Sequence, residues 1–170
     1  MLASIVSIAL FVKIASSFQK YGSFVMGTDR IVNIGDPLVM QAMIDRFFSS
    51  IFEATELSDE QQAGDLMMEA SINLLACFTQ EYEGVVVPPY LQVEVLAKRL
   101  TDTLVPLGLL SEDLCKERDP NMVVLVVISG MAEEFLKLLA TVHQEQQTQD
   151  VFELRCNALK SKWIRYFLGE

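Results

Sequence analysis

Apolar and polar residues along most of this chain alternate with the period of an α-helix. In several long segments apolar side chains recur at steps of three and four residues, which places them on one face of a helix. The pattern contains no β-hairpin signal. It predicts helices over residues 37–56, 58–83, 89–105, 111–116, 120–144 and 150–168.

The segment from Pro120 to Gln144 is the most apolar of these predicted helices. It opens with an unbroken apolar run, residues 122–128, whose valines would on their own also suit a buried strand. The helical pattern continues beyond Gly130 to Val142 without a stop signal, and this length favours a single helix. Because the first half of the helix is apolar on all sides, we expect it to be central and largely buried.

Local signals mark where several helices begin. Asp36-Pro37 and Asp119-Pro120 each place a capping carboxylate directly before a proline that fits the first helical turn. Ser58 and Gln61 have the spacing of a capping box. Residues 85–89 (Val-Val-Val-Pro-Pro) predict an extended connector between two helices.

Residues 1–21 are strongly apolar and allow three interpretations. A signal peptide would need a basic start, and no Lys or Arg precedes the apolar run. A membrane-spanning helix would need about 20 largely apolar residues, and Lys13 and Lys20 interrupt this segment. We favour a buried first helix, followed by a glycine-containing loop over residues 22–35. Together with residues 36–170 it would form an all-α, single-domain helical bundle of six or seven helices with a largely buried central helix.

The chain is strongly acidic, and its charged residues are unevenly distributed. The net charge of −10 at pH 7 opposes binding to nucleic acid and to anionic lipid, so we expect no nucleic-acid partner and no membrane association. No Lys, Arg or His occurs between residues 47 and 97. Such a run is usually a solvated face, but it also suits docking of a basic protein partner. The acidic residues of this region, our candidates for partner binding, are Glu53, Glu56, Asp59, Glu60, Asp65, Glu69, Glu81, Glu83 and Glu94.

The last predicted helix is the one locally basic element. Its cations, which lie among aromatic residues, are Arg155, Lys160, Lys162 and Arg165. Basic and aromatic residues together can meet a membrane surface or an acidic groove. Since the chain as a whole is acidic, we expect these cations to pair instead with the acidic 47–97 region, within the fold or between subunits.

Residues that commonly carry catalysis or bind metals are few and scattered. His143 is the single histidine, which removes the H-E-x-x-H and E-x-x-H metal-binding patterns. The three cysteines form no C-x-x-C pair, and Cys77 and Cys156 suit core positions in a reducing compartment such as the cytoplasm. Phosphate-loop and nucleophile-elbow signatures are also absent. We therefore expect no metal, no cofactor and no enzymatic activity.

The apolar composition favours binding over catalysis. Hydrophobic residues make up 51% of the chain, slightly more than in an average globular domain, which leaves apolar surface for a thick core or an interface. We predict a helical interaction or regulatory module, such as an inhibitor, that binds a protein partner or associates into a homo-oligomer. The alternative is a carrier or sensor of a small apolar ligand or lipid, because methionine-rich helices can line an apolar pocket.

Overall fold

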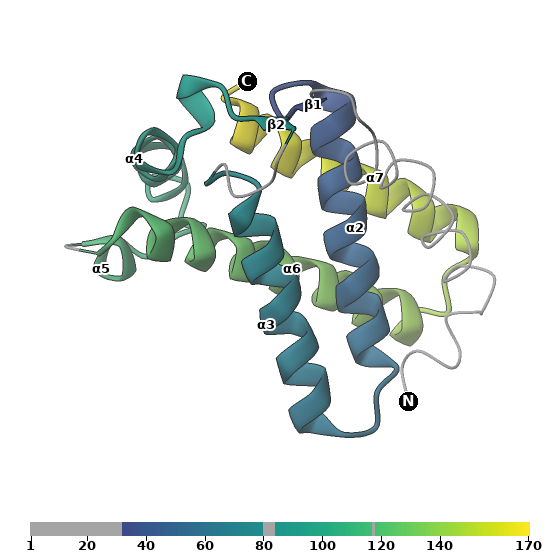
Figure 1. The fold of residues 1–170 in the computed structure, drawn as a ribbon. Coiled ribbons are helices and arrows are strands. Elements are labelled where there is room, and N and C mark those ends of the chain that lie inside the picture. The colour runs from purple at the N-terminus through teal and green to yellow at the C-terminus, as the bar shows by residue number, and fades with distance from the viewer. Residues whose placement is uncertain (1–31, 80–83, 117) are drawn as a thin grey trace.

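A computed structural model of the chain describes residues 32–79, 84–116 and 118–170, and these residues are mostly helical (Figure 1). The six α-helices of this part are α2 (Pro37–Thr55), α3 (Glu60–Ala76), α4 (Val93–Leu104), α5 (Glu112–Cys115), α6 (Pro120–Gln144) and α7 (Gln149–Leu168). The prediction of an all-α bundle is confirmed. The first helix predicted over residues 1–21 lies outside the described residues, as does most of the loop predicted over 22–35.

Aspartate caps start α2 and α6 where the sequence predicted them. The Leu38 amide donates to Asp36 Oδ1 at 2.9 Å, and the Asn121 amide donates to Asp119 Oδ1 at 2.8 Å. Each bond satisfies an amide that has no carbonyl partner inside its own helix. A proline follows each cap as the first helical residue. Proline has no backbone N–H, and at this position the helix offers no carbonyl to accept one.

α3 is shorter than predicted at both ends. Its cap is Asp59, one residue after the predicted Ser58, because the Asp59 carboxylate accepts from the Gln61 and Gln62 amides at 2.8 and 3.1 Å. The helix ends at Ala76 instead of continuing to residue 83, and residues 77–79 form a turn. This turn brings Phe78 into the core, where its ring stacks on Phe167 with 5.4 Å between centroids.

The extended residues between α3 and α4 form a short parallel pairing that the sequence did not predict. Strand β1 (Val32–Asn33) pairs with β2 (Val85–Val86), with Val32 opposite Val85. A 3-10 turn, η2 (Pro89–Leu91), follows. α4 therefore begins at Val93 and not at the prolines, since Gln92 is extended and interrupts the helical geometry.

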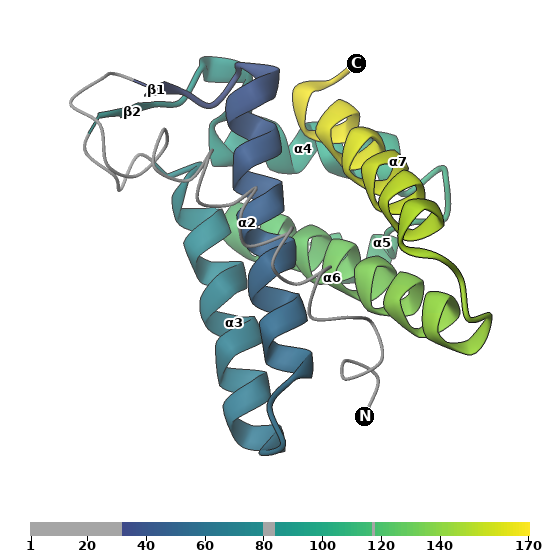
Figure 2. The same ribbon diagram turned by 90° about the vertical axis from the view of Figure 1, so that its right-hand side faces the viewer.

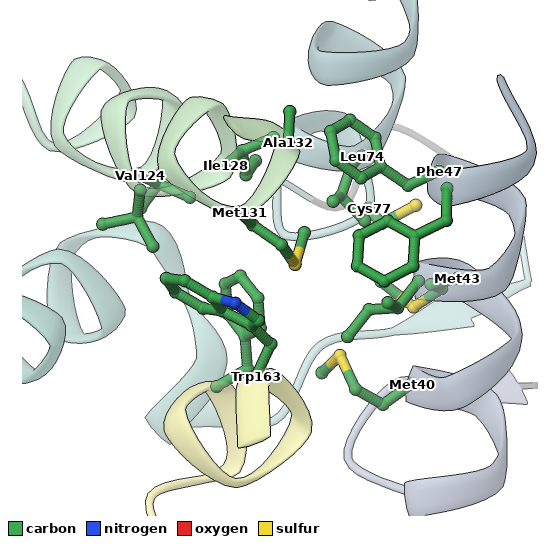
Figure 3. Packing of buried hydrophobic residues seen from close by; sticks show 14 of the residues in the cluster. Met40, Met43, Phe47, Leu74, Cys77, Val124, Ile128, Met131, Ala132 and Trp163 are labelled. Atoms are coloured by element: carbon green, nitrogen blue, oxygen red, sulfur yellow. The ribbon is translucent and has the colours of Figure 1, made fainter. Parts of the chain in front are cut away.

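α6 is the central helix of the described bundle, as predicted. It contacts α2, α3, α4, α5 and α7, and both ribbon views show it crossing the middle of the molecule (Figures 1 and 2). Phe135 of α6 stacks on Phe48 of α2 with 4.4 Å between ring centroids. Side chains of α2, α6 and α7 converge between the helices, where Trp163 points towards Met131 (Figure 3). The buried residues of α6 are Val123, Val124, Val127, Ile128, Met131, Ala132, Phe135, Leu139 and Val142.

Arg99 of α4 fixes the end of α7. Its guanidinium donates to the carbonyl oxygens of Tyr166 at 2.9 Å, Phe167 at 2.5 Å and Tyr90 at 3.1 Å. The first two carbonyls belong to the last turn of α7, which has no further helical amide to bond and where a cation is favourable. α7 then ends at Gly169 with a φ of 79°, a left-handed conformation that glycine adopts without strain.

Candidate interaction surface

Seven of the nine acidic residues predicted to bind a partner lie in the described part of the chain, and all seven are exposed. Glu94 stands apart from the others, on α4. Glu81 and Glu83 lie outside the described residues. The structure brings the other six together along the α2–α3 hairpin, defined as the two helices and the turn 56–59: Glu53, Glu56, Asp59, Glu60, Asp65 and Glu69.

The turn of the α2–α3 hairpin extends beyond the central helix. Both ribbon views show the turn at the end of the hairpin remote from β1 and β2, with the first half of α3 past α6 (Figures 1 and 2). In agreement, no residue of α3 before Ala70 is buried. The first half of α3 is therefore a preformed helix that offers most of its circumference to solvent.

The exposed side of α3 combines negative charge with apolar side chains. Met68 and Ile72 are 55% and 50% exposed, although both are large and apolar. Steps of three and four residues place them on one side of the helix with Asp65 and Glu69, which are also exposed. We call this set, Asp65, Met68, Glu69 and Ile72, the α3 outer face.

Sequence reasoning found the acids of the α3 outer face but not its apolar members. The methionine-rich helices were linked only to a possible apolar pocket, and no contact role was predicted for Met68 or Ile72. A usable signal exists, because both positions fall off the stripe of Ala70 and Leu74 that packs inward. Two large apolar residues on the polar side of an amphipathic helix mark a contact surface more specifically than the acids do.

A second outward face, of opposite charge, lies on α7. Leu154 is 72% exposed, more than any other large apolar side chain among the described residues. Helical spacing places it on one side of α7 with Val151 and with three cations. We call this set, Val151, Leu154, Arg155, Lys162 and Arg165, the α7 outer face.

An open hollow of about 340 Å³ adjoins the α7 outer face, between α6 and α7. Leu138, Ala158 and Leu159 form its apolar part. Arg155 and Lys162 supply positive charge at its rim, and Glu134 supplies one negative charge. This combination suits an apolar side chain whose neighbours are acidic.

The basic residues of α7 form ion pairs inside the fold, but with partners other than those predicted. Lys160 Nζ lies 2.6 Å from Asp45 of α2, and Lys162 Nζ lies 2.5 Å from Glu134 of α6. Arg155 lies 3.8 Å from Glu145. None of these three acids belongs to the 47–97 region, so the described fold does not contain the internal form of the predicted pairing, and pairing between subunits stays a prediction. The six acids of that region on the hairpin face solvent, whereas Asp45 faces α7.

Asp45 is the one charged side chain that the described core buries, at 5% exposure. Burial raises the pKa of its carboxyl group above the ordinary 3.8, and Lys160 lowers it by a smaller amount. Desolvation therefore outweighs the attraction between the two charges. The pair ties α2 to α7 and leaves Lys160 unable to contribute to the α7 outer face.

The described residues contain no group of three or more His, Cys, Asp or Glu side chains that could hold a metal ion. Cys77 and Cys156 are buried and unpaired, as expected for core positions. Burial raises the pKa of each thiol to about 11, so both stay protonated at neutral pH and are poor nucleophiles. Within the described ranges, no helix has the length and apolar character required to cross a membrane.

Comparisons with models of known protein families, with curated proteins and with solved structures found no match to this chain. The α3 and α7 outer faces each combine charge with two exposed apolar side chains on a long helix.

Proposed function

We propose that this protein is a helical interaction module that binds a basic protein partner through the α3 outer face. The observation that carries the proposal is the exposure of Met68 and Ile72 beside two carboxylates. Single exposed apolar residues are ordinary on protein surfaces, but adjacent ones within a charged rim have the composition of a binding anchor. The sequence between positions 47 and 97 contains no basic residue.

The two kinds of residue contribute differently to binding. Burying Met68 or Ile72 completely would contribute about 1.5–3 kcal/mol each, reduced by the half of each side chain that the fold already covers. Asp65 and Glu69 would chiefly accelerate the encounter with a basic surface and exclude acidic competitors. Because Asp59 caps α3 and the helix exists before binding, little conformational entropy is lost when the partner docks.

The test uses a fluorescently labelled synthetic peptide with Lys and Leu at helical spacing as the basic amphipathic probe. Fluorescence anisotropy gives its Kd for the full chain and for two double variants, Asp65→Lys/Glu69→Lys and Met68→Ser/Ile72→Ser. We expect each double variant to weaken binding by about tenfold or more, the charge variant mainly through slower association. Asp59 is left unchanged because its carboxylate caps the helix.

A matched control separates this site from the general acidity of the chain. Glu112→Lys/Asp113→Lys on α5 makes the same change in charge at two exposed positions away from α3. The proposal expects this variant to bind the probe nearly as well as the unmodified chain. Equal weakening by both charge variants would mean that the probe responds only to net charge, and the proposal would fail.

A second candidate function, a carrier of a small apolar ligand, is favoured by one observation. Trp163 is only 2% exposed, and its indole nitrogen has no hydrogen-bond partner among the described residues. A buried indole N–H usually donates to an acceptor, which a bound ligand would supply beside Met40 and Met131 (Figure 3). Native mass spectrometry of the protein purified from its host tests this function. A retained small molecule supports it, and the bare polypeptide mass counts against it.

A further inference from the structure

The α3 and α7 outer faces carry opposite charges on a chain that is acidic as a whole. Asp65 and Glu69 make one face negative, and Arg155, Lys162 and Arg165 make the other positive. Only 13 of the 170 residues are Lys or Arg, so three cations on one side of one helix form a marked local concentration. A surface of this kind attracts the charge that the α3 outer face presents.

The apolar side chains and the lengths of the two faces also match. The α3 outer face covers residues 65–72, about 10 Å along the helix axis at 1.5 Å per residue. The α7 outer face covers residues 151–165, about 21 Å, so the shorter face fits within the longer one. Met68 and Ile72 would meet Leu154 and the apolar side chains of the adjoining 340 Å³ hollow.

The internal ion pairs of α7 do not remove its cations from such a contact. The side chains of Lys162 and Glu134 are 34% and 28% exposed, and those of Arg155 and Glu145 are more exposed still. The exposed Arg155–Glu145 pair contributes little, and the partly exposed Lys162 keeps a side that a second carboxylate can reach. Lys160, which is held by buried Asp45, is outside the face.

The two faces do not meet within one chain. α2 lies between α3 and α7 in both ribbon views and contacts both helices (Figures 1 and 2). We infer that the basic partner of the α3 outer face is a second copy of this chain, which contributes its α7 outer face; this inference rests on the proposed function. Two such contacts related by a twofold axis would close a dimer, and a single contact repeated in one direction would form a longer assembly.

The test is a charge exchange followed by sedimentation velocity over a wide concentration range. One variant, Asp65→Lys/Glu69→Lys, makes the α3 outer face basic. The other, Arg155→Glu/Arg165→Glu, makes the α7 outer face acidic and leaves the Lys162–Glu134 pair intact. We expect each variant alone to associate about tenfold more weakly than the unmodified chain, because like charges then face each other.

Mixing the two variants distinguishes this contact from any other. The basic α3 face of one variant matches the acidic α7 face of the other, so the mixture should associate about as strongly as the unmodified chain. The Glu112→Lys/Asp113→Lys chain, which has the same net charge as the α3 variant, should self-associate normally. A mixture that stays monomeric, or an unmodified chain that is monomeric throughout, would overturn the inference.

Three further outcomes separate this inference from its alternatives. If the unmodified chain is monomeric but still binds the Lys–Leu probe through α3, the inference fails and the proposed function stands. If neither the probe nor a second copy binds α3, both fail. A monomeric chain that instead sediments with vesicles of phosphatidylserine and phosphatidylcholine, and loses this binding in Arg155→Glu/Arg165→Glu, would identify the α7 outer face as a membrane-binding surface and overturn the inference.

Discussion

α6 and α3 are both long helices rich in apolar residues, yet they use these residues differently. α6 buries nine residues and contacts every other α-helix of the described fold. α3 buries four, all in its second half, and turns Met68 and Ile72 towards solvent. The difference lies in position, because α6 runs between other helices, while the first half of α3 extends beyond them and its second half is covered on one side only (Figure 2). Apolar content therefore does not by itself separate a core helix from a helix that leaves large apolar side chains in solvent.

The largest expected difference between the two helices is in the cost of removing an apolar side chain. Phe135→Ala in α6 should lower the free energy of unfolding by about 3–5 kcal/mol, because it empties a fully buried site stacked on Phe48. Ile72→Ala in α3 should change it by at most about 0.5 kcal/mol. Urea unfolding followed by circular dichroism measures both. Similar losses for the two variants would show that the fold, and not a partner, requires Ile72.

The two lysine ion pairs of α7 should likewise differ in stability cost, because one pair is buried and the other is closer to solvent. Asp45→Ala should cost about 3 kcal/mol, since it leaves the largely buried Lys160 without its carboxylate. Glu134→Ala, which removes the partly exposed partner of Lys162, should cost about 1 kcal/mol. The double replacement Asp45→Leu/Lys160→Met should recover most of the first loss, because an apolar pair of similar size needs no desolvation. Chemical unfolding of the three variants measures these values.

The buried pair should also show in the pH dependence of stability. Because burial raises the pKa of Asp45 above 3.8, the folded protein binds this proton more tightly than the unfolded chain does. The contribution of Asp45 is thus fully present below pH 3.8 and is lost as the pH rises through its pKa in the folded protein. Relative to Asp45→Asn, the unmodified protein should therefore become less stable as the pH rises through that window and change no further above it. A difference that stays constant with pH would contradict the assigned direction.

The smallest expected effects are stabilising ones at two helical glycines, where α3 and α6 should behave alike. A Cβ added at Gly64 in α3 or at Gly130 in α6 would meet no atom within 4 Å. Gly64→Ala and Gly130→Ala should each raise the free energy of unfolding by about 0.5–1 kcal/mol through helix propensity. Thermal unfolding of both variants tests this. A loss at Gly130 alone would reveal a packing constraint on α6.

The elements that the sequence predicted well are those fixed by local signals. α2, α6 and α7 begin and end within about two residues of the prediction, since their caps and helical periods lie within the segments themselves. The end of α3 was missed because the turn after Ala76 depends on Phe78 packing against Phe167, from the other end of the chain. The β1–β2 pairing was missed for the same reason.

The candidate site also has features that follow from local sequence and features that depend on contacts between distant parts of the chain. The exposure of the acids could be predicted, because an acidic run without cations seldom enters a core. For Met68 and Ile72 the helical stripe indicates only that they lie off the side of Ala70 and Leu74, and how far each is exposed depends on which helix lies opposite that turn of α3. The partner of Lys160 could not be predicted from the sequence either, because Asp45 lies 115 positions away and no local pattern links the two residues.

That separation of 115 positions bears on the order in which the molecule assembles. α2 and α3 are neighbours in sequence and can pair after closing only a short loop, whereas the contact of α2 with α7 must bring together distant parts of the chain. We expect the hairpin to form early and α7 to dock late, as the step that completes the core around Trp163. Mutations at the contact between α2 and α7 would then mainly accelerate unfolding and leave the folding rate nearly unchanged. The lifetime of the folded protein would thus be set by how firmly its last helix is held.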